Sequence, residues 1–66
     1  MGYQEYRIWF SDGSYDKQRV VLFALNHEEA IISAQARRIK RRLDYTVFSV
    51  ELFNMLSGKY LPVKYL

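Results

Sequence analysis

One helix-forming segment lies near the middle of this chain, between two pairs of strand-like segments. In a chain of 66 residues this arrangement leaves a single helix to cover a single sheet. Half of the residues are hydrophobic and there is no cysteine, so neither disulfides nor a cysteine-based metal site can add stability. The whole chain, residues 1–66, is therefore predicted to form one small α+β domain with the element order ββαββ.

The first two strands are predicted at Tyr3–Phe10 and Lys17–Leu25. Asp12-Gly13 lies between them, and Asp-Gly between strand-like runs is a hairpin signal because glycine accepts a positive φ. The second segment contains the run 20–25, which is apolar at every position. Both of its faces are therefore expected to be covered.

The helix is predicted to begin at Asn26, which has capping-box spacing to Glu29, and to end near Leu43. At about 100° per residue, one narrow stripe of this helix is expected to pack on the sheet. That stripe consists of Ile32, Ala36, Ile39 and Leu43. The opposite stripe, expected to face solvent, consists of Ala30, Ala34, Arg37 and Arg41.

The last two strands are predicted at Thr46–Phe53 and Lys59–Tyr65, with a turn at Ser57-Gly58. Pro62 confines the last strand to a sheet edge, since proline cannot donate to a strand ladder. A right-handed crossover through the helix predicts the strand order 2-1-3-4, mainly antiparallel, with 1-2-3-4 as the main rival. In the third strand, Phe48, Val50 and Leu52 are expected on one face, and Tyr45, Val47 and Phe53 on the other.

A cluster of positive charge lies at residues 37–42, which hold five of the ten lysines and arginines of the chain. Such clustering is typical of a surface that binds phosphate, although cations also stabilise the C-terminal end of any helix. The pI near 9.4 and the net charge of +3 are modest for a nucleic-acid-binding protein. The clustering of the positive charges is therefore more informative than their total. The candidate nucleic-acid-binding residues are Arg37, Arg38, Lys40, Arg41 and Arg42.

A second candidate surface is the sheet face opposite the helix. With Tyr6, Ile8 and Phe10 under the helix, Arg7 and Trp9 are expected on the open side. Aromatic side chains there could stack on single-stranded bases, but they are also the residues that anchor protein contacts. The protein-contact interpretation is favoured, with Arg7, Trp9, Tyr45 and Phe53 as the interface.

Enzymatic motifs are missing from the sequence. His27 lies in the first helical turn, where it is expected to be exposed, and Ala30 and Ile31 offer no metal ligand at helical spacing. No catalytic residue, cofactor, metal or small-molecule substrate is predicted. The sequence shows no signal peptide and no membrane span, and the lack of cysteine is compatible with the cytoplasm, so a soluble cytoplasmic protein without membrane contact is expected.

Two classes of function remain. The first is a small accessory protein that binds nucleic acid through the basic helix surface. The alternative is a protein-interaction module, either a homodimer or an inhibitor of a larger host enzyme. In size and general character the chain resembles accessory proteins of bacteriophages, although no motif carries that resemblance.

Overall fold

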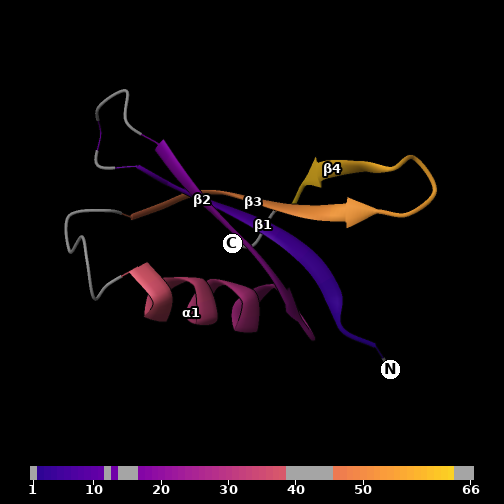
Figure 1. Cartoon of the computed structure of the whole chain (residues 1–66), viewed down its shortest axis with the longest axis horizontal. Helices are drawn as coiled ribbons and strands as arrows, with labels where there is room; N and C mark the ends of the chain where they lie inside the picture. The colour runs from indigo at the N-terminus through magenta and orange to yellow at the C-terminus, as the bar shows by residue number, and fades with distance from the viewer. Residues whose placement is uncertain (1, 12, 14–16, 39–45, 64–66) are drawn as a thin grey trace.

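The computed structural model describes residues 2–11, 13, 17–38 and 46–63. They form the strands β1 (Gln4–Ser11), β2 (Lys17–Ala24), β3 (Thr46–Asn54) and β4 (Lys59–Pro62), and the helix α1 (His27–Arg38). Figure 1 shows α1 along one face of the sheet, while no described element covers the other face. We call this second face the open face. The predicted α+β class and the ββαββ element order are confirmed.

The strand order is β2-β1-β3-β4, and every neighbouring pair is antiparallel. The predicted order is therefore correct and its rival 1-2-3-4 is excluded. β1 lies at the centre because α1 carries the chain back along the sheet before β3 pairs with β1. Among the described strands, β2 and β4 form the two edges, and Pro62 lies on the β4 edge as expected.

The core lies between the sheet and α1. The alternation of β1 places its large apolar side chains there, and β2 and β3 contribute through their pairing with β1. No buried residue of the described part is polar or charged. The buried residues are Tyr6, Ile8, Phe10, Val20, Leu22, Ala24, Ala30, Ala34 and Val50.

The start of α1 follows the capping prediction. The Asn26 side-chain oxygen accepts a hydrogen bond from the backbone N–H of Glu29 at 2.8 Å. The Glu29 carboxylate in turn accepts from the backbone N–H of Leu25 at 3.1 Å. Asn26 and Glu29 thus satisfy amide groups that the first helical turn leaves without partners.

The predicted helix face is wrong. Ala30 and Ala34 are fully buried against the sheet, whereas Ile32 is 65% exposed and Ala36 is exposed. The large side chains of β1 fill most of the space between the layers, so the helix contributes small residues that let its backbone lie close to the sheet. The rest of the predicted core stripe, Ile39 and Leu43, lies outside the described residues.

Candidate functional site

The structure places only part of the predicted basic cluster. Arg37 is exposed near the C-terminal end of α1, and Arg38 is the last described helical residue. Lys40, Arg41 and Arg42 lie outside the described residues. The prediction that Ala30 and Ala34 face solvent on the same stripe as Arg37 is wrong, because both are buried against the sheet.

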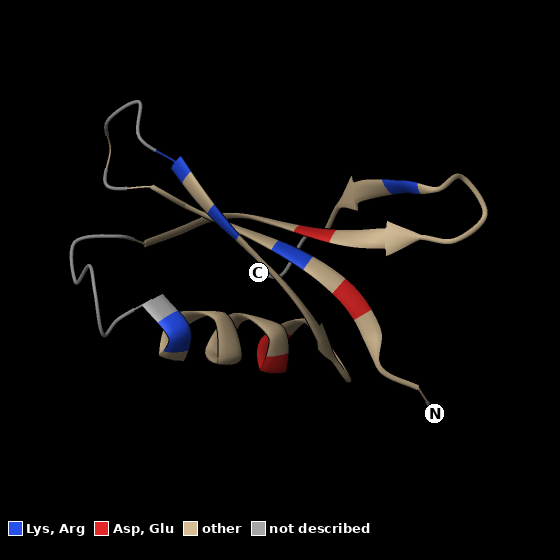
Figure 2. Cartoon of the chain, viewed as in Figure 1, with Lys and Arg blue, Asp and Glu red and all other residues tan. Residues whose placement is uncertain are grey.

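Cations from two elements gather at one end of the molecule. Lys17 and Arg19 are exposed on β2, and Lys17 pairs with Ser11, which also pairs with the first residue of β3. Figure 2 shows blue bands at the start of β2 and at the C-terminal end of α1, at the same end of the long axis. We call the group Lys17, Arg19 and Arg37 the basic end. The C-terminal end of α1 and the start of β3 both lie at this end.

The described acidic residues lie mostly away from the basic end. Glu28 and Glu29 occupy the first turn of α1, at the opposite end of the helix from Arg37. Glu5 lies in the first half of β1, opposite Phe23 of β2. Figure 2 shows red on these two elements and on β3, and it shows blue on β1 and on β4 as well as at the basic end. The charge of the described chain is therefore polarised along its length.

A hydrogen-bonded network occupies the middle of the open face. Arg7 Nε and Trp9 Nε1 both donate to Glu51 Oε1, at 2.6 and 2.7 Å. The side chains of Arg7 and Glu51 are only 27% and 18% exposed, so solvent screens this ion pair less than an exposed one. The Arg7 hydrogen bond, aided by that of Trp9, lowers the pKa of Glu51, and the Glu51 hydrogen bond raises the pKa of Arg7. The network holds the indole ring in a fixed orientation.

The network continues to the β4 edge. The Arg7 guanidinium lies 4.2 Å from the ring centroid of Tyr60, within cation–π distance. The Tyr60 hydroxyl donates to Glu5, and this hydrogen bond raises the pKa of Tyr60. Phe53 packs edge-on against Tyr60, with centroids 5.3 Å apart. The structure thus places three predicted interface residues, Arg7, Trp9 and Phe53, on the open face, while the fourth, Tyr45, lies outside the described residues.

A β-bulge adds to the open face an aromatic residue that was predicted on the opposite face. Trp9 pairs with Ser49 but Phe10 pairs with Val47, so Phe48 is an extra residue on β3. Val47 packs on the core, and Phe48 is 45% exposed and borders a depression next to Trp9. The predicted faces of Val47 and Phe48 are therefore wrong. Nothing in the sequence marks the bulge, since no glycine accompanies it.

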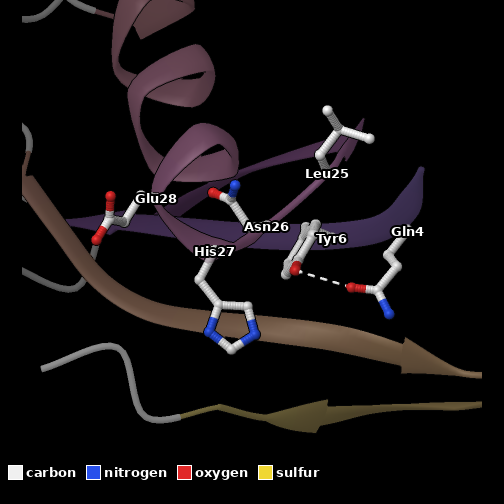
Figure 3. Close-up of a pocket in the computed structure, with 6 residues that line it drawn as sticks. All are labelled: Gln4, Tyr6, Leu25, Asn26, His27 and Glu28. Carbon is white, nitrogen blue, oxygen red and sulfur yellow. Dashed lines mark hydrogen bonds between the residues drawn. The ribbon is translucent and has the colours of Figure 1, made fainter. Parts of the chain in front are cut away.

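A second depression lies at the start of α1 (Figure 3). The Tyr6 hydroxyl donates to Gln4 Oε1 at 3.2 Å, and burial raises the pKa of Tyr6. His27, expected to be exposed, is half-buried with its ring edge-on to Tyr6 at 5.5 Å. The amide oxygen of Asn26 already caps the helix. The described side chains here include no nucleophile–base pair and no group of three potential metal ligands.

The turn between β3 and β4 displays two apolar side chains. Asn54 Oδ1 accepts from the backbone N–H groups of Leu56 and Ser57 at 2.9 and 3.0 Å, and Gly58 takes a positive φ of 70°. Met55 and Leu56 are 87% and 99% exposed at the tip of this ordered turn. The turn glycine is predicted from the sequence, whereas the exposure of these two residues is not.

No protein-family model matches the chain, and no solved structure matches it significantly. The described part contains no helix with the length and apolar character needed to cross a bilayer.

Proposed function

We propose that this protein is a small, non-catalytic accessory factor that binds nucleic acid in the cytoplasm, with the basic end on the phosphates. The observation that carries the proposal is the gathering of Lys17, Arg19 and Arg37 at one end of the molecule. The end of α1 alone would need one or two cations to complement its dipole. The additional cations on β2 are not needed for that purpose, and together with Arg37 they indicate a negatively charged ligand that extends over both elements.

The physical basis is counterion release. Each phosphate that a lysine or arginine neutralises frees a condensed cation, so the logarithm of the affinity falls by about 0.9 per phosphate and per decade of salt for duplex DNA, and by about 0.7 for single strands. The acidic residues at the other end of the protein orient the basic end toward the ligand during encounter. Contacts of this kind need no catalytic group.

The test is a salt series of binding to single- and double-stranded DNA and RNA, measured by fluorescence anisotropy. Arg37→Glu is expected to weaken binding and to flatten the salt dependence. Lys59→Glu is the matched control, because Lys59 is exposed on β4 and the change in net charge is the same. Equal effects of the two substitutions, or no binding at low salt, would contradict the proposal.

A second candidate function, protein interaction, is favoured by the position of β2 at the edge of the described sheet. This strand is eight residues long, contains no proline and has no described strand on its outer side. Long edges of this kind pair with other strands unless they are protected. A second copy fits well: with Val21 opposite its own copy, Arg19 faces Phe23 and Lys17 faces Leu25, so no like charges meet.

Val21→Lys tests this pairing, because it places two ammonium groups opposite each other at the two-fold axis. Val21 is 44% exposed, so the monomer is expected to tolerate the change. Ile32→Lys on the outer side of α1 is the control. Sedimentation equilibrium should show a dimer for the wild type and the control, and a monomer for Val21→Lys. A monomeric wild type at high concentration would refute the dimer.

A further inference from the structure

Two aromatic rings of the open face border one shallow depression. Its lining consists of Trp9, Lys17, Phe48, Ser49 and Glu51, which come from three strands. Its volume is about 260 Å³, below the range of about 300–1,000 Å³ that is typical of small-molecule pockets. The depression therefore suits one planar group of a larger ligand better than a whole metabolite.

The β-bulge creates this pair of aromatic residues. Without the extra residue, strand alternation would direct Phe48 to the core side, because Trp9 pairs with Ser49. The bulge leaves Val47 on the core and Phe48 45% exposed beside Trp9. Bulges that redirect a side chain are common next to functional sites. Exposing a phenylalanine costs hydrophobic stabilisation, which a ligand that covers the ring would restore.

The polar groups around the depression indicate the charge of the ligand. Lys17 Nζ lies 5.2 Å from the ring centroid of Phe48, and the Arg19 guanidinium lies 5.7 Å from that of Trp9. The acidic member, Glu51, already accepts hydrogen bonds from Arg7 and Trp9. Cations thus flank the aromatic rings, while Glu51, the described carboxylate that lines the depression, is paired within the protein.

We propose that this depression, defined by Trp9 and Phe48, receives a base of a single-stranded nucleic acid, whose adjoining phosphates lie on Lys17 and Arg19. The inference rests on the proposed function and adds strand specificity to it. Bases in a duplex are stacked on one another and cannot reach a sheet surface, whereas unpaired bases can stack on aromatic side chains. The two aromatic rings provide a stacking surface for the base, and the two cations provide partners for its phosphates.

Trp9 is the only tryptophan of the chain, so its emission reports on this depression. The probes are a short oligothymidylate and an abasic oligonucleotide of the same length, which carries the phosphates without bases. Stacking should quench Trp9 with the first probe and not with the second. Stacking changes affinity by about 5- to 150-fold per base, so oligothymidylate should bind tighter by a factor in this range.

Phe48→Leu should remove most of the preference for oligothymidylate over the abasic strand. Phe23→Leu is the matched control, because Phe23 is 65% exposed and lies on the same face farther along β2. Circular dichroism establishes that both variants fold. A preference that survives Phe48→Leu, or is lost equally in Phe23→Leu, would overturn the assignment of the site.

The remaining outcomes separate this inference from the proposed function. Equal affinity for both probes without quenching refutes base stacking and leaves phosphate binding intact. Tighter binding of duplex than of single strands also refutes the inference alone. Quenching by polyglutamate as strong as that by oligothymidylate would assign the depression to an acidic peptide instead. No binding of any nucleic acid at low salt refutes the proposed function itself.

Discussion

Replacing alanine by leucine at two positions of α1 tests which face of the helix meets the sheet. Ala34 is fully buried, and Ala36, two residues along, is exposed. Alanine and leucine have similar helix propensities, so the two variants differ mainly in where the added carbons go. At Ala34 they must displace the helix or core side chains, whereas at Ala36 they extend into solvent.

Overpacking of a core costs about 1–3 kcal/mol, so Ala34→Leu should lower the free energy of unfolding by about 2 kcal/mol. In a domain of this size 1 kcal/mol shifts Tm by about 4–8 °C, which gives a fall of about 8–16 °C. Ala36→Leu should stay within about 0.5 kcal/mol of the wild type, as exposed substitutions usually do. Both values can be measured by urea denaturation and thermal melts followed by circular dichroism.

Ile32→Ala provides an independent measurement on the same helix. Truncating a buried isoleucine costs about 2–5 kcal/mol, but Ile32 is 65% exposed and should lose less than about 1 kcal/mol. If Ile32→Ala and Ala36→Leu were both strongly destabilising while Ala34→Leu was neutral, the stripe predicted from the sequence would be the buried one. That result would refute the packing of α1 described here.

Two further predictions concern hydrogen bonds of the described chain. Asn26→Ala removes the acceptor for the Glu29 backbone N–H and should cost about 1 kcal/mol, lowering Tm by about 4–8 °C, whereas Asn26→Asp should retain most of the stability. The folded-state pKa of Glu51 lies below the ordinary value of a glutamate, so its contribution to stability is present above that ordinary value and is lost as the pH falls through the lower, folded-state pKa. Unfolding free energies measured across the acid range should therefore decline less steeply in Glu51→Gln than in the wild type, and parallel curves would contradict this role.

The sequence predicted the sheet better than the helix face, and the reason is physical. Period-two alternation identified Tyr6, Ile8 and Phe10 as core residues, and all three are buried. On the helix, hydrophobicity favoured the stripe with Ile32 over the stripe with alanines. Hydrophobicity does not report how much space the sheet leaves, and here large residues of β1 leave room only for Ala30 and Ala34.

The open face shows the same limit. Placing Arg7 and Trp9 there required only the alternation of β1, whereas their common partner, Glu51, is 44 and 42 residues away in sequence. Phe48 could not be placed, because a bulge without glycine depends on how β3 fits against β1. Long-range fit therefore determines the parts of the candidate site that local patterns miss.

The position of the cations determines whether one ligand can contact the phosphate-binding residues and the base-stacking residues at the same time. A basic surface confined to the outer side of the helix would be separated from the open-face aromatic residues by the thickness of the domain. Lys17 and Arg19 are on β2, and both lie within cation–π distance of open-face rings. One single strand can therefore meet cations and aromatic rings on the same face without wrapping around the protein. In that case Lys17→Gln should weaken the binding of oligothymidylate and of the abasic strand alike, and it should reduce the slope of log affinity against log salt concentration by about 0.7. Phe48→Leu should lower the affinity for oligothymidylate without changing that slope.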